Sequence, residues 1–281
     1  MKIALATIKM LRPINLVLGS LAVLISAALM PRWPQLSVLT YALITVITFN
    51  AAANALNDFF DYPIDLVNRP DRPLASGILP RNAGWVVALV LFVAGSLSAS
   101  LLPNEARNIA VFVALPAMVL YTPIFKGLPL AGNLVVAVIL GLAFLFAGAA
   151  FGYLELMWAP AGLAFGYTLV REIVKDIEDV EGDRQVGVGT CAVRWGVPAC
   201  IILAVSLTLV LMFGCLLPYI LGVYGTTYLV AVVIGVEFPL LYTIIYLVNH
   251  PSPRGCGWVA KVLKVDIFAG LLAIYLTKFD V

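Results

Sequence analysis

Two short stretches of this chain hold six of its nine aspartates and have the spacing of a metal-binding site. In the first stretch, residues 54–65, the polar side chains of Asn57, Asp61 and Asp65 recur at every fourth residue. Residues spaced by four lie above one another on a helix, so these three side chains share one face. Such an array of carboxylate and amide oxygens can bind a divalent cation.

The second stretch, residues 176–183, repeats this spacing with Asp179 and Asp183, and Asp176 lies three residues before Asp179. Neither stretch contains histidine or cysteine, and a site of hard oxygen ligands favours magnesium or manganese over zinc or copper. Magnesium is usually held by one or two carboxylates together with substrate phosphates. The predicted magnesium ligands are Asn57, Asp58, Asp61, Asp65, Asp176, Asp179 and Asp183.

Two carboxylate clusters that hold magnesium are suited to bind a diphosphate. The metal charge stabilises the negative charge that develops on the departing diphosphate. The carbon–oxygen bond then ionises to a carbocation, which is accessible at modest cost only when the carbon is allylic. The competing interpretation, solvated helix ends paired with nearby cations, is disfavoured because two clusters have matched spacing. We therefore predict a catalytic role for Asp61, Asp65, Asp179 and Asp183.

Basic and polar residues near the clusters are candidates for substrate binding. Cations next to a metal site can bind the phosphate oxygens that the metal leaves free, and Arg72 follows the first cluster in a proline-rich loop. For Lys126, a role as an anchor at the membrane edge is an equal alternative. Asn15 lies just inside an apolar helix, where it either faces a cavity or binds a neighbouring helix. The predicted substrate-binding residues are Asn15, Asn57, Arg69, Arg72, Tyr121, Lys126, Arg171 and Lys175.

The rest of the chain has the composition of a membrane protein. Hydrophobic residues make up 63% of the 281 residues and charged residues 11%, against about 25% charged in a soluble domain. The net charge of +2 is too small to argue for a nucleic-acid partner. We predict an all-α multi-pass protein with one domain, residues 1–281. A span needs about 20 apolar residues, and nine candidates lie at roughly 11–30, 36–59, 82–102, 107–124, 128–150, 157–177, 195–217, 222–248 and 260–277.

The lysines and arginines predict the orientation in the membrane, because these residues collect at the cytoplasmic ends of spans. With nine alternating spans and a cytoplasmic N-terminus, the inner segments hold 14 of the 17 lysines and arginines. The C-terminus then lies outside the cell. Both aspartate clusters fall on the cytoplasmic side, beside the segments 61–81 and 178–194. Long loops of this kind usually carry function, so we expect a polar cytoplasmic cap over the active site.

At these residues the chain resembles the UbiA superfamily of intramembrane prenyltransferases. The run from Asn57 to Asp65 matches the superfamily motif Asn-Asp-x-x-Asp-x-x-x-Asp, and Asp179 with Asp183 matches a second motif, Asp-x-x-x-Asp. The resemblance covers essentially the whole chain. It implies nine transmembrane helices around a central cavity that opens sideways to lipid. It also implies magnesium-dependent transfer of a prenyl group from its diphosphate, with the motif residues holding the metal and basic cap residues binding the diphosphate.

The prenyl acceptor differs among members of this superfamily. The stretches 68–77 and 171–183 are most similar to members that move a geranylgeranyl group onto geranylgeranylglyceryl phosphate, which forms the second ether bond of archaeal-type membrane lipids. An acceptor with its own phosphate needs further cations, and four lie on the predicted inner side: Lys9, Arg12, Arg171 and Lys175. The expected partners are thus a prenyl diphosphate, a lipid-like phosphorylated acceptor and membrane lipids.

Two alternatives remain open at this point. Other members of the superfamily prenylate an aromatic acceptor of quinone biosynthesis, such as 4-hydroxybenzoate, and the carboxylate clusters do not distinguish the acceptor. A membrane transporter is the alternative outside enzymes. Transporters place ion sites near the bilayer midplane and often contain inverted repeats. Here the charges lie at inner span ends, and both motif-bearing spans run in the same direction, which disfavours that alternative.

Overall fold

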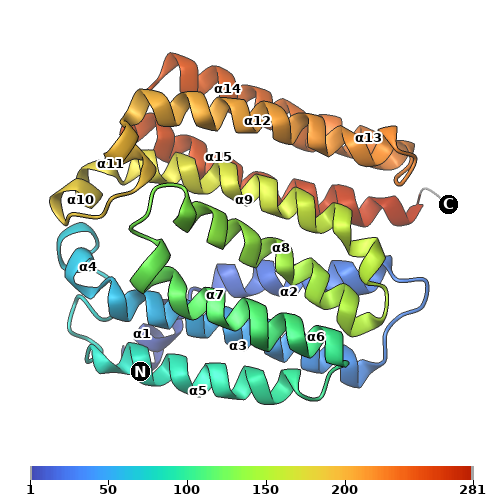
Figure 1. Cartoon of the computed structure of the whole chain (residues 1–281), viewed down its shortest axis with the longest axis horizontal. Helices are drawn as coiled ribbons and strands as arrows, with labels where there is room; N and C mark the ends of the chain where they lie inside the picture. The colour runs from blue at the N-terminus through green and yellow to red at the C-terminus, as the bar shows by residue number, and fades with distance from the viewer. Residues whose placement is uncertain (1, 280–281) are drawn as a thin grey trace. The chain divides into compact units, whose positions relative to one another are not determined.

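The computed structural model describes residues 2–279 and, at Asn68, the backbone alone. The terminal positions 1, 280 and 281 of the predicted domain 1–281 lie outside the described residues. Every regular element within residues 2–279 is a helix, which confirms the predicted all-α class (Figure 1). The chain divides into two compact units: residues Met1–Phe125 with Leu142–Met157, and residues Lys126–Gly141 with Trp158–Val281. A single domain stays a prediction.

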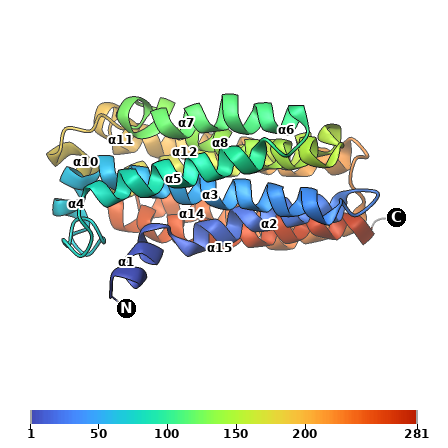
Figure 2. The same cartoon turned by 90° about the horizontal axis from the view of Figure 1, so that it is seen from below.

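The first unit is built around the long helix α3. Its helices are α1 (Lys2–Met10), α2 (Pro13–Leu29), α3 (Leu36–Phe60), α4 (Tyr62–Asn68), α5 (Asn82–Ala99), α6 (Asn104–Asn108), the π-helix η1 (Ile109–Ala114), α7 (Leu115–Leu120), the π-helix η2 (Tyr121–Phe125) and the 3-10 helix η3 (Leu154–Met157). Helices α1 and α2 meet at a bend of 50°, which is visible in Figure 2. The division between the two units falls within α8 (Ala131–Phe151).

Small residues let α5 pack closely against α3. A Cβ atom added at Gly95 of α5 would lie 2.5 Å from Thr48 Oγ1, so no larger residue fits there without a shift. Nearby, the Ser98 hydroxyl donates to the Tyr41 carbonyl oxygen at 2.9 Å. Close backbone approach through small residues and hydroxyl contacts is the usual way in which helices associate in membranes. This packing fixes the direction of α3, which carries the first aspartate cluster at its C-terminal end.

The second unit is built around α9. Its further helices are α9 (Trp158–Glu178), α10 (Val180–Gln185), α11 (Cys191–Trp195), α12 (Val197–Ile220), α13 (Thr226–Val232), the π-helix η4 (Val233–Glu237), α14 (Phe238–Asn249), α15 (Pro253–Leu276) and the 3-10 helix η5 (Thr277–Phe279). Helix α9 packs against both α12 and α15, and its side chains Ile173, Val174 and Ile177 are fully buried. The second cluster begins in the last turn of α9. The buried apolar face of this helix therefore fixes the position of the cluster.

Within residues 2–279, six helical segments are long and apolar enough to cross a membrane, and the bent pair of α1 and α2 would make a seventh. These findings support a multi-pass membrane protein. Each of the nine predicted spans coincides with a helix or a continuous helical run. Helices α9 and α15 are long enough but carry more charge: Arg171, Glu172 and Lys175 in α9, and Lys261, Lys264 and Asp266 in α15. The count of nine spans therefore stays a prediction.

Candidate active site

Asp61 of the first cluster lies at a break between α3 and α4. Its dihedral angles, φ −74° and ψ −1°, keep it in the right-handed helical region, although α3 ends there and α4 begins at the next residue. Backbone bonding continues across the break, because the Asp61 N–H donates to the Asn57 carbonyl oxygen and the Asp65 N–H donates to that of Asp61, both at 2.8 Å. The predicted four-residue register is therefore kept, although the helix is interrupted. Pro63 lies in the first turn of α4, where its missing N–H costs no helical hydrogen bond.

Three carboxylates of the first cluster are buried, and an arginine joins two of them. Asp58, Asp61 and Asp65 are 2%, 7% and 5% exposed. Arg72 Nη1 lies 2.6 Å from Asp65 Oδ2 and 3.2 Å from Asp58 Oδ1. Burial raises the pKa of Asp65, although Arg72 opposes that shift. Burial acts to lower the pKa of Arg72, but Asp58 and Asp65 outweigh it and raise that pKa. The guanidinium is thus a fixed cation beside the predicted metal ligands.

A second arginine reaches this cluster from the bend between α1 and α2. Arg12 Nη2 lies 2.6 Å from Asp58 Oδ1. Arg12 has a left-handed backbone with φ +53°, and the Asn54 amide donates to the Leu11 carbonyl oxygen at 3.0 Å, which ties the bend to α3. Asn15, which follows this bend, was predicted from the sequence to bind substrate. Asn15 is half-buried in the first turn of α2, and its role stays a prediction.

Asn57 is oriented by a residue from a distant part of the sequence. The Thr122 hydroxyl donates to Asn57 Oδ1, so the amide oxygen has a partner that fixes the side chain. Thr122 belongs to the π-helix η2, and π-helical turns inside longer helices are frequent at functional sites. The predicted substrate residue Tyr121 precedes Thr122 and is half-buried, and Lys126 follows η2 and is also half-buried. Arg69 is exposed just after α4.

The second cluster repeats the backbone geometry of the first. Asp179 lies at the break between α9 and α10 with φ −90° and ψ +1°. Its N–H donates to the Lys175 carbonyl oxygen at 2.9 Å, and the Asp183 N–H donates to the Asp179 carbonyl oxygen at 2.9 Å. In each motif the aspartate at the break is followed four residues later by a buried aspartate, Asp65 in one and Asp183 in the other.

Two carboxylates of the second cluster accept hydrogen bonds from residues that the sequence patterns did not indicate. The Asn133 amide donates to Asp176 Oδ2 at 3.0 Å, and the Thr190 hydroxyl donates to Asp183 Oδ2 at 3.2 Å. The Cys191 thiol lies 3.7 Å from Asn133 Oδ1 and donates to it. The Cys191 thiol therefore orients the amide that holds Asp176.

The predicted phosphate ligands Arg171 and Lys175 share one buried carboxylate. Arg171 Nη1 lies 2.8 Å from Glu172 Oε1, and Lys175 Nζ lies 3.1 Å from Glu172 Oε2. Arg171 Nε is buried and has no hydrogen-bond partner among the described residues. The two cations therefore share one carboxylate, and Lys175 directly precedes Asp176 on α9.

No group of three or more histidine, cysteine, aspartate or glutamate side chains within residues 2–279 has the arrangement of a metal site. In the first cluster, Asp58 and Asp65 bind guanidinium groups instead. The available donors in both clusters are nevertheless carboxylate and amide oxygens, the chemistry that magnesium prefers. The metal-binding roles of the seven predicted ligands stay predictions.

Comparison with known proteins relates this chain to a family of prenyltransferases. The sequence profile of the UbiA prenyltransferase family matches residues 16–263. The digeranylgeranylglyceryl phosphate synthase of Natronomonas pharaonis is 37% identical over 80% of this chain and 82% of its own length. The synthase of the same name from Thermococcus sibiricus is 33% identical over 96% of this chain and 95% of its own length.

Solved structures have the same fold. The structure of a digeranylgeranylglyceryl phosphate synthase superposes with a TM-score of 0.79 at 27% identity and covers all of both chains. A UbiA homologue from Archaeoglobus fulgidus, bound to GPP and Mg²⁺, superposes with a TM-score of 0.73 at 18% identity over 96% of this chain and 99% of its own. The predicted resemblance is confirmed by the extent of the profile match and by relatives that align along most of the chain. The chain belongs to the UbiA prenyltransferase family.

Proposed function

We propose that this protein is a prenyltransferase that moves a geranylgeranyl group from geranylgeranyl diphosphate to the free hydroxyl of geranylgeranylglyceryl phosphate. One observation carries the proposal. Both motifs of the family occur on helix breaks of the same geometry, in a chain that aligns over 96% of its length with a digeranylgeranylglyceryl phosphate synthase. The name of that relative supports the choice of acceptor and product.

In this proposal the two motifs hold magnesium. The principal ligands are Asn57, Asp61, Asp65, Asp179 and Asp183, and Asp58 and Asp176 complete the candidate set. The oxygen-only donors and the buried carboxylates support this role. Bound magnesium would neutralise the charge that develops on the departing diphosphate. Arg72 supplies a further cation, held by Asp58 and Asp65 before substrate arrives.

The basic residues near the two motifs are assigned to the phosphates of the two substrates. Lys126, Arg69 and Arg72 bind the diphosphate, and Tyr121 and Asn15 line its site. Arg171 and Lys175 bind the phosphate of the acceptor, an assignment supported by two cations that share the single ion-pair partner Glu172. A doubly cationic segment suits a phosphorylated acceptor better than an aromatic acid with a single carboxylate.

The reaction breaks the allylic carbon–oxygen bond of the donor, and the electron pair leaves with the diphosphate. The hydroxyl oxygen of the acceptor forms the new ether bond to that carbon. Its proton passes to an aspartate of the clusters or to the released diphosphate. Asp61 is only 7% exposed, so its position is shielded from bulk water, which would otherwise compete with the acceptor for the cation.

The membrane arrangement that we propose has nine spans around a central cavity, a cytoplasmic cap formed by the segments 61–81 and 178–194, a cytoplasmic N-terminus and an outer C-terminus. The distribution of lysine and arginine supports this orientation in a cell membrane. Single cysteines introduced at Ser76 and Ser252 test it in a variant that lacks the four native cysteines. A membrane-impermeant thiol reagent added to intact cells should label neither position, and labelling from outside would contradict the orientation.

Product analysis tests the function. Purified protein is incubated with magnesium and geranylgeranyl diphosphate, with either geranylgeranylglyceryl phosphate or 4-hydroxybenzoate as acceptor. We expect the diether phosphate with the first acceptor and no product with the second. If prenylated 4-hydroxybenzoate were the only product, the protein would be an aromatic-acceptor prenyltransferase. Asp61→Ala and Asp183→Ala should each abolish turnover, and normal turnover in either folded variant would overturn the role of the clusters.

A further inference from the structure

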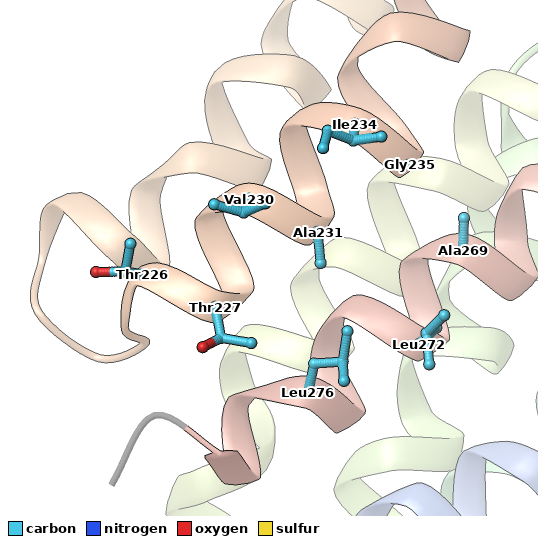
Figure 3. A pocket seen from close by; sticks show the side chains of 9 residues that line it. All are labelled: Thr226, Thr227, Val230, Ala231, Ile234, Gly235, Ala269, Leu272 and Leu276. Carbon is cyan, nitrogen blue, oxygen red and sulfur yellow. The ribbon is translucent and has the colours of Figure 1, made fainter.

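An open groove lies in the second unit, between α13 with its continuation η4 on one side and α15 on the other (Figure 3). Its volume is about 570 Å³, within the range of ligand-binding cavities. Apart from two threonines at the start of α13, every residue that lines it is apolar. The rims are formed by Val230, Ile234 and Leu272, which are 52%, 65% and 54% exposed. None of the residues of the proposed active site lines this groove.

The groove is closed at one end by two small residues. A Cβ atom added at Gly235 would lie 3.3 Å from Ala269 Cβ, so the two helices are in contact there. At the other end the groove begins beside Thr226 and Thr227. Nine residues separate Thr226 from Gly235, which corresponds to about 14 Å of helix. This length is close to half of the ~30 Å hydrocarbon core of a bilayer, the depth of one leaflet.

We propose that this groove binds one hydrocarbon chain of a bilayer lipid, from the leaflet in which α13 begins. Helix α13, with η4 and α14, belongs to a segment long and apolar enough to cross the membrane, so hydrocarbon surrounds the groove. A flexible apolar chain matches its depth, its narrow closed end and its polar mouth. Binding rests on close van der Waals contact with Ala231, Gly235 and Ala269, because burial from lipid brings no hydrophobic gain.

The position of the groove argues against the prenyl chain of a substrate as the occupant. Helix α15 begins beside the end of α9, where a Cβ atom added at Gly257 would lie 2.7 Å from Glu178 Oε1. Glu178 lies within the second cluster, between Asp176 and Asp179, whereas Ala269 lies twelve residues beyond Gly257 along α15, about 18 Å away. A chain that extended from a phosphate at this cluster would meet the closed end of the groove first. The occupant therefore enters from the opposite membrane edge.

Native mass spectrometry of the full-length protein, extracted from membranes in a mild detergent, tests this proposal. We expect one phospholipid of the host membrane retained per chain. Ala231→Phe places a ring on the floor of the groove, and Ile234→Ala removes part of its rim without adding bulk. Each should lower retention at least fivefold. The control Val210→Phe adds a ring to an exposed apolar position of α12 that does not line the groove, and it should retain the lipid.

Prenyltransferase activity and thermal unfolding of each variant are measured in parallel. Both groove variants should keep activity within twofold of the parent protein and unfold at similar temperatures. A failure of the lipid-binding proposal can therefore be distinguished from a failure of the proposed function. The proposal is overturned by equal lipid retention in parent and both groove variants, or by no retained lipid in the parent. If the parent protein retained a prenyl diphosphate, the groove would be a substrate site. If the parent were a dimer and Ala231→Phe a monomer, the groove would be a protein interface.

Discussion

The guanidinium of Arg72 lies 2.6 Å from the carboxylate of Asp65, and both side chains are largely shielded from solvent. A buried carboxylate without a partner is expensive, so this pair allows the first cluster to fold before any metal binds. The same nitrogen of Arg72 also reaches Asp58. Arg72 is therefore not a mobile cap residue. It is positioned by the carboxylates next to which the diphosphate is proposed to bind.

Arg72→Ala should both destabilise the protein and abolish activity. The variant leaves Asp58 with Arg12 alone and leaves Asp65 without its guanidinium. Removal of one partner from a buried ion pair costs about 3–5 kcal/mol, and the lower end applies here because Asp58 keeps Arg12. Thermal unfolding in detergent measures the loss. The double variant Arg72→Ala with Asp65→Asn should recover part of the stability but none of the activity.

Arg32→Ala is the matched control for this series, because Arg32 is exposed in the loop between α2 and α3. It should change neither stability nor turnover. Arg72→Lys keeps the charge but loses the planar fork that reaches two carboxylates. We expect it to unfold between the parent and Arg72→Ala. If Arg72→Ala were as stable as Arg32→Ala, the buried ion pair would not contribute as described.

Asp65→Asn should separate stability from activity. Folding raises the pKa of Asp65, chiefly through burial, so the folded state holds this proton to a higher pH than the unfolded state does. The stability contributed by the protonated form is present at low pH and is lost as pH rises through the folded-state pKa. At pH 7 without metal, the neutral amide removes the cost of burying an ionised carboxylate but also ends the ion pair with Arg72, which keeps Asp58. The variant should therefore lose less stability than Arg72→Ala does.

Magnesium provides the second half of this test. A metal that binds only the folded state at a hundred times its Kd stabilises it by about 2.7 kcal/mol. Added magnesium should raise the unfolding temperature of the parent protein and have a much smaller effect on Asp65→Asn, which should be inactive. A metal-free Asp65→Asn that unfolds at as low a temperature as Arg72→Ala would contradict the cost assigned to the buried ionised carboxylate. If magnesium raised the unfolding temperature of both proteins equally, Asp65 would not be a magnesium ligand.

Thr122→Val should lower turnover with little change in stability. Valine has nearly the shape of threonine but cannot donate to Asn57 Oδ1, so the amide loses its fixed orientation. One hydrogen bond contributes about 1 kcal/mol, which corresponds to a roughly fivefold change in rate. Steady-state kcat/KM at several magnesium concentrations measures the effect. Thr40→Val, at an exposed hydroxyl that bonds only to the backbone of α3, is the control and should behave as the parent.

The part of the site that is local in sequence could be predicted from the sequence. Asn57, Asp61 and Asp65 recur within eight residues, and the helical bonding pattern carries their register across the break at Asp61. The break itself was not indicated by the spacing, because four-residue intervals do not reveal where one helix ends and another begins. The apolar runs likewise located the helices, but the number of membrane spans stays open because α9 and α15 carry several charges.

The partners that orient these ligands could not be predicted in the same way. Thr122 lies 65 residues from Asn57, and Asn133 lies 43 residues from Asp176. A single threonine or asparagine in an apolar helix has no periodic pattern, and its hydroxyl or amide bonds just as readily to the local backbone. Arg12 was noted only as an available inner cation, because its contact with Asp58 depends on the bend between α1 and α2.

Substitutions at Asn133 should weaken the second cluster in a defined order. Asn133→Ala removes the donor to Asp176 Oδ2, and Asn133→Asp replaces it with a second carboxylate. Like charges in contact repel, so activity should fall in the order parent, Asn133→Ala, Asn133→Asp. Asn104→Ala, at an exposed asparagine of α6, is the control. A higher activity for Asn133→Asp than for Asn133→Ala would show that the position tolerates negative charge and does not serve to donate to Asp176.

Outside both clusters, the second unit contains a buried pair whose contribution is to stability. The Tyr167 hydroxyl of α9 donates to Asp266 Oδ2 of α15, and the two residues are 8% and 5% exposed. Tyr167→Phe removes the donor and leaves a buried carboxylate less satisfied, which costs about 1–3 kcal/mol. Asp266→Asn should cost less, because the amide oxygen still accepts from the hydroxyl and no charge is buried. Thermal unfolding, with Tyr219→Phe at an exposed tyrosine as control, tests this order. The two helices would not depend on the pair if Tyr167→Phe unfolded at the parent temperature, and the charge would be needed if Asp266→Asn were the less stable variant.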